Sequence, residues 1–262
     1  GISAAALEGD RLWLLSDRSR LFSLDWPELV PVGPFGATML SQEELRLGDG
    51  QELDAEALVL LPDGSRIVAD EARGWLVRFL AGDARPAERP WPVAGLGDDQ
   101  GTNQGLETVA RLPDGSLLAI GEAEDGGPDR HRAMRLADDY SSTLAQLYRS
   151  RPGFRPTDAA VAGAHLFVLE RSVSLLGGWR ARIVAVPLSD VPGHPDGVIE
   201  GRELATLSGP TLGENHEALV AVAAGAGYEL LVLADDNFSP LQRTLLVALT
   251  WSPEREDARL GR

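Results

Sequence analysis

The chain lacks cysteine and lysine altogether, and only 4 of its 262 residues are histidine. Without cysteine it forms no disulfide, offers no thiolate to a metal and has no cysteine nucleophile. All 24 basic residues are therefore arginine. A genome rich in G and C explains the use of arginine in place of lysine. The functional alternative is that arginine binds phosphate or carboxylate with two hydrogen bonds.

Long apolar runs are missing too. No run approaches the roughly 20 residues that span a bilayer, so we expect no transmembrane segment. The motifs G-x-S-x-G, H-E-x-x-H and G-x-x-x-x-G-K-[ST] do not occur. Their absence argues against the common serine hydrolases, zincins and P-loop enzymes.

The charge is strongly acidic: 40 acidic against 24 basic residues give a net charge of −16. Such a charge repels nucleic acid and anionic membranes and attracts metal cations. With 44% apolar and 24% charged residues, the composition is that of a folded globular protein. We expect a single domain over residues 1–262, a monomer, and no nucleic-acid partner.

What the sequence does contain is a repeated hairpin with an acid at each end. The segments LDAEALVLLPDGSRIVADE and NQGLETVARLPDGSLLAIGE align as acid, apolar strand, Pro-Asp-Gly turn, apolar strand and acid. The two acids are 15 residues apart in both segments, from Glu56 to Glu71 and from Glu107 to Glu122. Such a match indicates two copies of one structural unit.

Three looser copies complete the series. One runs 12 residues from Asp158 to Glu170, and another runs 18 residues from Glu217 to Asp235. The last begins the chain and has Ser3 where the others have their first acid. The length differences fall in the turns, where they cost least.

The repeat has a period near 50 residues. Its first positions are 3, 56, 107, 158 and 217, with steps of 53, 51, 51 and 59. Two strong strands followed by weaker ones at this period are typical of a propeller blade. The runs GWLVRFL, RARIVAVPL and RTLLVALTW fit third strands. The predicted fold is an all-β propeller of five four-stranded antiparallel blades around a central channel, with six blades as the alternative.

Aromatic residues in such a fold belong mainly to the layers between blades. We therefore predict core positions for Trp13, Trp75, Trp179 and Trp251. His216 precedes Glu217, but alternation along a strand points the two side chains apart, which favours a structural role for His216.

The acids of the hairpins should meet at one end of the channel. The first strands of all blades line the channel and run in the same direction, so equal positions form a ring. The second strands are antiparallel and return to the same end. The predicted ligands of a divalent cation are Glu56, Glu71, Glu107, Glu122, Asp158 and Glu217.

Crowded carboxylates need neutralisation, because like charges a few ångströms apart raise one another's pKa. Oxygen ligands suit Ca²⁺ best, and Mg²⁺ or Mn²⁺ if waters complete the shell. Alternatively, Arg18, Arg171 and Arg243, each close to a strand end, pair the acids into a structural network. A metal surrounded by arginines is the mixed case.

The chain resembles the bacterial phytase-like family described as having esterase-like activity of phytase. The residues that carry the resemblance are LDAEALVLLPDG, NQGLETVARLPDG, FVLERS, and NHEALV followed by ADDNFSPLQRT, and it extends over nearly the whole chain. The family pattern has glycine after the first acid of the hairpin, whereas this chain has Ala57, Thr108 and Ala218.

The resemblance implies a secreted or periplasmic propeller that hydrolyses an anionic phosphoester or ester. A first residue Gly1 rather than methionine fits a signal segment or lipoprotein anchor removed upstream. The resemblance places Glu56, Glu107, Glu217, Glu170, Arg171, Asp235, Asp236 and Asn237 at the site. The predicted catalytic residues are Glu170, Arg171, Asp235, Asp236 and Arg243. The alternatives are a non-catalytic binding propeller with a structural cation and a lactone hydrolase of the gluconolactonase type.

Overall fold

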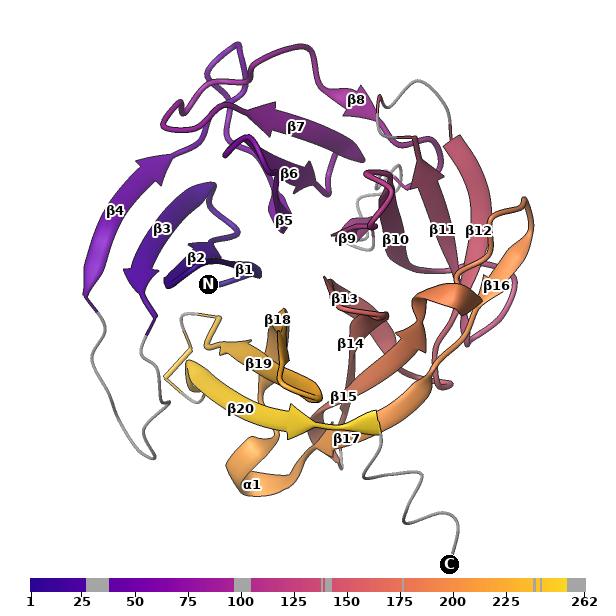
Figure 1. Ribbon diagram of the computed structural model, residues 1–262. Coiled ribbons are helices and arrows are strands. Elements are labelled where there is room, and N and C mark those ends of the chain that lie inside the picture. Colours follow the sequence, from indigo (N-terminus) through magenta and orange to yellow (C-terminus); the bar gives the residue numbers. More distant parts are fainter. Residues whose placement is uncertain are drawn as a thin grey trace, which may run out of the picture.

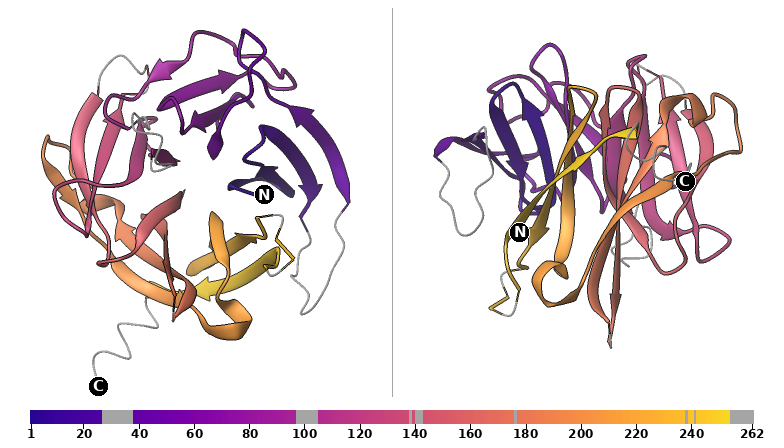
Figure 2. Two further views of the ribbon diagram at one scale, coloured as in Figure 1. Left: turned by 180° about the vertical axis from the view of Figure 1, so that it is seen from behind. Right: turned by 60° about the horizontal axis from the view of Figure 1, so that its bottom comes forward.

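Five sheets of mainly antiparallel strands are arranged around a common axis in the computed structural model (Figure 1). The structure describes residues 1–26, 38–96, 105–137, 139, 143–175, 177–237, 239–240 and 242–253. The sheets follow one another in chain order, and the last lies beside the first, as both views in Figure 2 show. The predicted five-bladed propeller is confirmed.

Blades 1 and 2 have four strands each. Blade 1 consists of β1 (Ala4–Glu8), β2 (Arg11–Leu15), β3 (Arg20–Asp25) and β4 (Met39–Glu44). Blade 2 consists of β5 (Ala55–Leu60), β6 (Arg66–Asp70), β7 (Trp75–Phe79) and β8 (Trp91–Pro92).

Blades 3 to 5 vary the pattern. Blade 3 has β9 (Leu106–Arg111), β10 (Leu117–Glu124), β11 (Arg130–Leu136) and β12 (Thr143–Arg149), and a fifth strand, β16 (Gly197–Ile199), lies parallel to β12. Blade 4 has β13 (Arg155–Ala162), β14 (His165–Ser174), β15 (Gly178–Pro187) and β17 (Arg202–Leu207). Blade 5 has β18 (Asn215–Ala224), β19 (Gly227–Asp235) and β20 (Leu245–Trp251), three strands within the described residues.

Helices contribute little to this fold. The described part of the chain contains a 3₁₀ turn, η1 (Leu188–Asp190), and a single turn of helix, α1 (Gly209–Leu212). Neither it nor any other described segment forms a helix long and apolar enough to cross a membrane.

The Pro-Asp-Gly turns close the first hairpins of blades 2 and 3 in the same way. Gly64 and Gly115 have φ angles of 79° and 91°, a region that glycine enters at little cost. The side chains of Asp63 and Asp114 accept hydrogen bonds from the backbone N–H two residues on, at 2.9 and 3.1 Å. The turn residues therefore determine where β5 and β9 end.

The core consists of five apolar layers between neighbouring blades rather than one central cluster. Because both faces of a blade are covered, β6 is buried at every position. Trp13, Trp75 and Trp251 pack in or against these layers, as predicted. Trp179 belongs to none of these described layers and lies at the channel instead, which corrects its predicted place in the core.

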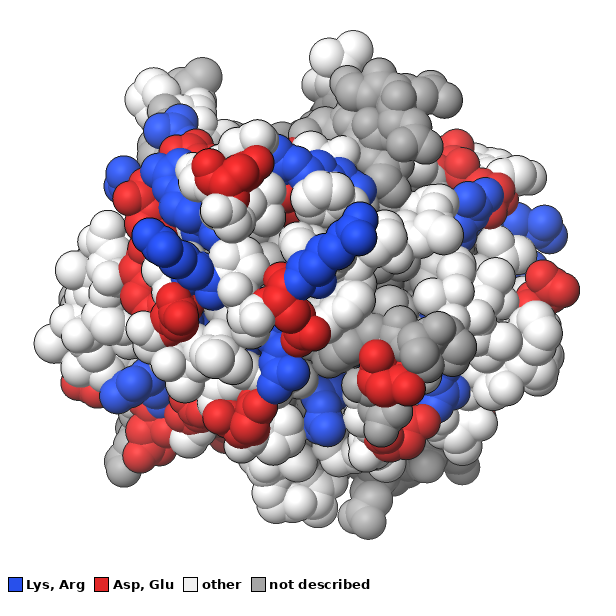
Figure 3. Space-filling view, turned by 90° about the horizontal axis from the view of Figure 1, so that it is seen from above, with Lys and Arg blue, Asp and Glu red and all other residues white. Residues whose placement is uncertain are grey.

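Many acids of the outer surface lie next to arginines. In the space-filling view of Figure 3, arginine and acidic side chains lie side by side over the face shown. Solvent-accessible ion pairs of the described chain include Arg78–Asp63 at 2.6 Å and Arg46–Glu52 at 2.8 Å. Exposed pairs of this kind are worth about 0–1 kcal/mol each. Larger electrostatic contributions therefore come from the buried charges inside the channel.

Candidate metal centre at one end of the channel

A β-bulge at the start of the inner strand places one acid of three blades at the channel. The pairing of the first two strands skips Glu56 in blade 2, Glu107 in blade 3 and Glu217 in blade 5. A bulge leaves the extra residue unpaired and redirects its side chain. All three residues line one pocket of about 320 Å³. The structure thus brings together three of the predicted ligands.

Hydroxyl residues occupy this position in the other two blades. The bulge of blade 4 falls on Thr157, and Ser3 precedes β1 in blade 1. Ser3 Oγ donates to the carbonyl of Ala55 at 2.6 Å, and Thr157 Oγ1 lies 3.5 Å from the carbonyl of His216. Each hydroxyl therefore contacts the backbone just before the acid of the next blade.

Asp158 does not lie in the ring, so its predicted position there is wrong. Its Oδ2 accepts the N–H of Leu219 in blade 5 at 2.7 Å, and its Oδ1 accepts the N–H of Ala159 at 2.8 Å. Burial raises the pKa of Asp158 well above its usual range, while the two N–H donors oppose that rise. The physical reason for the error is the register: the bulge falls at Thr157, and one residue on, the side chain turns to the other face.

The second strand of blade 4 is also shifted by one residue from the predicted alignment. Asp70 pairs with Ala55 in blade 2, so Glu71 is the next residue beyond that pair. In blade 4 the corresponding pair is Glu170 with Pro156, and the next residue is Arg171. An arginine therefore holds the position at which the other blades have an acid.

Glu170 points away from the channel, into the layer between blades 3 and 4. It is fully buried and accepts a hydrogen bond from the hydroxyl of Tyr148 at 2.6 Å. Arg182 Nε lies 3.2 Å from its other oxygen. Burial raises the pKa of Glu170, and Tyr148 and Arg182 oppose that rise. These contacts contradict its predicted place at the channel.

The remaining predicted catalytic residues divide into two groups. Asp235 lines the pocket, together with Asn237. Asp236 and Arg243 are absent from the described lining. Arg243 instead pairs with Glu214, with 2.6 Å between Nε and Oε1. The structure thus separates two residues of the predicted catalytic set from the pocket.

The closest group of acids lies in blade 2. Asp54, Glu56 and Glu71 each offer a carboxylate oxygen, and these oxygens lie within 4.8 Å of one another. Glu71 is fully buried, and its Oε1 accepts the N–H of Gly105 at 2.8 Å. Three carboxylate oxygens at this separation fit around a single divalent cation.

Glu56 and Glu107 lie among other acids, and the charge of Arg171 offsets only part of the rise in the pKa of Glu107. Burial raises the pKa of Glu56 well above its usual range, and the charges of Glu217 and Glu71 raise it further. Burial, followed by the charge of Glu122, does the same to the pKa of Glu107. Among the described residues, none donates a hydrogen bond to either carboxylate.

Arg171 neutralises another part of the ring. Its guanidinium donates to Glu217 and Asn215, at 2.8 Å for Asn215, and lies 3.2 Å from Glu122. Burial alone would lower the pKa of Arg171, but Glu107, Glu217 and Glu122 together raise it above its ordinary value. The guanidinium also lies over the ring of Trp179, 5.6 Å from its centre.

These contacts fit the mixed arrangement of arginine and candidate metal ligands. Arg171 pairs the acids of blades 3 and 5, while the blade 2 group lies beside it. Glu122 is also 3.5 Å from Arg155, so it belongs to the paired part.

Sequence reasoning missed four residues of the pocket: Asp54, Thr157, Trp179 and Asn215. Asp54 and Asn215 each lie two residues before an acid of the ring, a spacing that offered a signal. Nothing in the local sequence marks Thr157 or Trp179, because their places depend on the bulge and on Arg171.

The fold and this pocket define a propeller with an acidic group at one end of its channel. The chain belongs to the phytase-like family: residues 1–238 match the family described as "Esterase-like activity of phytase". The predicted resemblance is confirmed. A search of curated proteins found no match.

Solved structures share the fold at low sequence identity. An α-L-arabinofuranosidase from Clostridium thermocellum has a TM-score of 0.52 at 12% identity, with 95% of this chain and 88% of that chain covered. A luciferin-regenerating enzyme has a TM-score of 0.51 at 12% identity, covering 96% and 91%. Virginiamycin B lyase from Staphylococcus aureus has a TM-score of 0.45 at 10% identity, covering 96% and 84%. At these identities the likeness concerns the fold alone.

Proposed function

We propose that the protein is a metal-dependent hydrolase of phosphoester or ester bonds, with a divalent cation held at the acidic end of the channel. The observation that carries this proposal is the group of Asp54, Glu56 and Glu71, whose oxygens lie within 4.8 Å of one another. Carboxylates this close repel one another unless a cation or proton lies between them. The family description, which names esterase-like activity, supports the proposal.

The residues present fit such a cation. The blade 2 group would supply three ligands. Glu107 lines the pocket together with Asp54 and Glu56, and no described residue donates a hydrogen bond to it. An all-oxygen set suits Ca²⁺, and Mg²⁺ or Mn²⁺ would keep more water. A bound divalent cation polarises a phosphoryl or acyl oxygen.

The other pocket residues have separate tasks in this proposal. The guanidinium of Arg171 holds the anionic group of the substrate, since its planar donors match phosphate and carboxylate. A carboxylate of Glu107, with its raised pKa, accepts the proton of the attacking water. Trp179 forms an aromatic wall against which a less polar part of the substrate packs.

The charge of the pocket favours a substrate with few negative charges. Six acids line it, namely Asp17, Asp54, Glu56, Glu107, Glu217 and Asp235, against Arg171 as the one described arginine. A polyanion would meet this field and a net charge of −16, and would need bound cations before it could enter. A singly charged ester is the better fit.

The test is hydrolysis of p-nitrophenyl phosphate and p-nitrophenyl acetate with added Ca²⁺, Mg²⁺ or Mn²⁺ and with excess chelator. We expect metal-dependent turnover that Glu56→Gln abolishes. Glu124→Gln, which removes an exposed acid near the end of β10, serves as the matched control. Turnover that survives exhaustive chelation would rule out the metal-dependent mechanism.

A non-catalytic propeller with a structural cation is the second candidate. It is favoured by one observation: Arg171 joins Glu122 of blade 3 to Glu217 of blade 5, which is what a stabilising network does. In that case Ca²⁺ raises the melting temperature, yet no ester, phosphate or lactone in a substrate panel is hydrolysed. Turnover of lactones alone would instead indicate a lactone hydrolase.

A further inference from the structure

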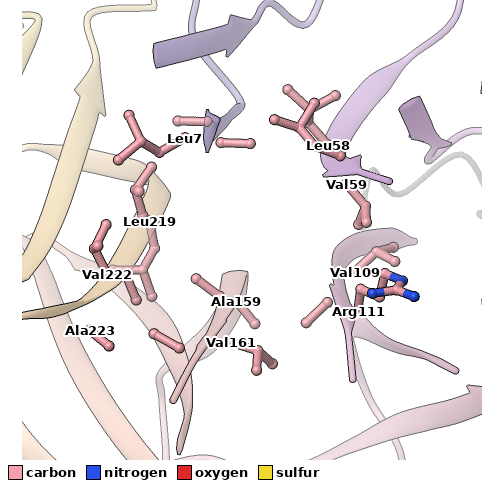
Figure 4. A pocket seen from close by; sticks show the side chains of 18 of the residues that line it. Leu7, Leu58, Val59, Val109, Arg111, Ala159, Val161, Leu219, Val222 and Ala223 are labelled. Atoms are coloured by element: carbon pink, nitrogen blue, oxygen red, sulfur yellow. The ribbon is translucent and has the colours of Figure 1, made fainter. Parts of the chain in front are cut away.

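Beyond the acidic ring, the channel becomes an apolar cavity of about 490 Å³. Its lining comes from the residues that follow the ring along all five inner strands, β1, β5, β9, β13 and β18. Because these strands all start at the acidic end, the cavity lies toward the opposite end of the channel. Figure 4 shows its side chains around the hollow.

The lining is almost uniform in chemistry. Its described residues are alanine, valine, leucine and glycine, and Arg111 is the one exception among them. In Figure 4, Arg111 is accordingly the only labelled side chain with nitrogen atoms. A hollow of this size falls within the range of about 300–1,000 Å³ that small-molecule sites occupy.

Arg111 is the last residue of β9 and is partly buried. No described residue accepts a hydrogen bond from its guanidinium, and no described carboxylate lies within ion-pair distance of it. No acid of the described residues lines this cavity. A cation beside an apolar hollow, without an acid to pair it, is complementary to an anion attached to an apolar body.

We propose that this cavity binds a small amphipathic anion, a molecule with an apolar body and a single carboxylate or sulfonate head group. The head group contacts Arg111, and the body extends along Val109 and Leu58 toward the acidic ring. The orientation follows from charge, because the ring acids repel an anionic head group at the other end. A cationic amphiphile finds no acid in the described lining and should bind much more weakly.

The experiment is titration calorimetry of the full chain with decanoate in the presence of a chelator, which keeps the metal centre out of the measurement. We expect one decanoate per chain. Arg111→Gln should weaken binding about tenfold, as expected for the loss of one charged hydrogen-bonding partner. Ala221→Phe, which fills part of the hollow, should weaken it at least as much.

Two controls make the outcome decisive. Arg20→Gln removes an exposed arginine of β3 that lies outside the cavity and should leave binding unchanged. Decyltrimethylammonium tests the sign of the charge on the same chain length. Equal binding of decanoate to Arg111→Gln and the parent protein would overturn the proposal, as would equal binding of the two amphiphiles or no binding of decanoate at all.

Discussion

Arg171 of blade 4 holds the strand position that Glu122 holds in blade 3, and its Nη2 lies 3.2 Å from Glu122 Oε1. The same guanidinium donates to Glu217 of blade 5. One substitution in the repeat, an acid replaced by arginine, therefore links three blades at the acidic end of the channel. It also supplies a positive charge in a pocket whose other described ionisable side chains are acids.

Replacing this arginine should destabilise the metal-free protein and strengthen its dependence on a cation. Arg171→Gln removes the guanidinium that pairs with Glu122 and Glu217, and Arg155 at 3.5 Å from Glu122 replaces only part of it. Breaking such a buried pair costs about 3 kcal/mol. Urea unfolding in chelator measures this loss. Added Ca²⁺ should restore more stability to the variant than to the parent, because the pocket has lost its competing positive charge.

Arg243→Gln is the matched control for that measurement. Arg243 pairs with Glu214 and with the carbonyl oxygens of Pro210 and Thr211, outside the pocket. Any stability that it loses should not be recovered with Ca²⁺. An equal Ca²⁺ response in both arginine variants would contradict the role assigned to Arg171.

Asp158 should behave as a link between blades and not as a metal ligand. Asp158→Ala leaves the buried N–H of Leu219 without its acceptor, so we expect a loss of about 2 kcal/mol in the free energy of unfolding. The affinity for Ca²⁺, measured by calorimetry, should stay within twofold of the parent value. Loss of Ca²⁺ binding in a folded Asp158→Ala protein would restore the position that sequence reasoning predicted.

The metal-free protein should lose stability as the pH rises. The pKa values of Glu56 and Glu107 lie above the ordinary 4.5 in the folded state, so between 4.5 and those raised values the folded protein binds more protons than the unfolded chain. Their contribution is therefore fully present below pH 4.5 and is lost as the pH rises through the raised values. Melting temperatures in chelator across this range measure the effect.

The matching variant removes the titrating group. Glu107→Gln should flatten the decline with pH, because glutamine stays neutral throughout. Saturating Ca²⁺ should reverse the trend in the parent, since a bound cation favours the ionised carboxylates. An unchanged pH profile in Glu107→Gln would show that the decline comes from other groups.

Glu170 should matter for stability and not for the chemistry of the pocket. Glu170→Gln removes the charge that faces Arg182 at 3.2 Å, and we expect a loss of about 2 kcal/mol in the free energy of unfolding. Tyr148→Phe, which removes only the 2.6 Å hydrogen bond, should cost less. Turnover per folded molecule should remain that of the parent in both variants, and its loss in Glu170→Gln alone would return Glu170 to the catalytic set.

The repeat made the propeller predictable from sequence, but it led to a wrong strand register in blade 4. The hairpins around Glu56 and Glu107 share both their spacing and their turn, so the sequence alone aligns the strands of these two blades correctly. In blade 4 an acid happens to follow Thr157, and another precedes Arg171. A bulge adds one residue without a local sequence signature, so alignment by acids placed both strands one residue off.

Side-chain packing determines two features that the repeat does not predict, the place of Trp179 and the apolar cavity. Trp179 was predicted to lie between blades because aromatic residues of a propeller mainly fill those layers, yet it lies at the pocket beside the guanidinium of Arg171. The apolar cavity, in contrast, follows from residues that were assigned to the core as apolar strands. Small side chains such as Ala159 and Ala221 leave space between the inner strands, and no pattern of apolar residues reveals that space.

Thr157 offers the most direct test of the register. Thr157→Glu adds a fourth bulge acid to the ring, and the added repulsion should lower the free energy of unfolding in chelator by about 1–2 kcal/mol. The new carboxylate should also increase the affinity for Ca²⁺, measured by calorimetry, because it contributes another oxygen to the pocket. Thr157→Gln has the same volume without the charge and should not increase Ca²⁺ affinity. If Thr157→Glu and Thr157→Gln bind Ca²⁺ equally, position 157 does not face the cation, and the assignment of the ring in blade 4 fails.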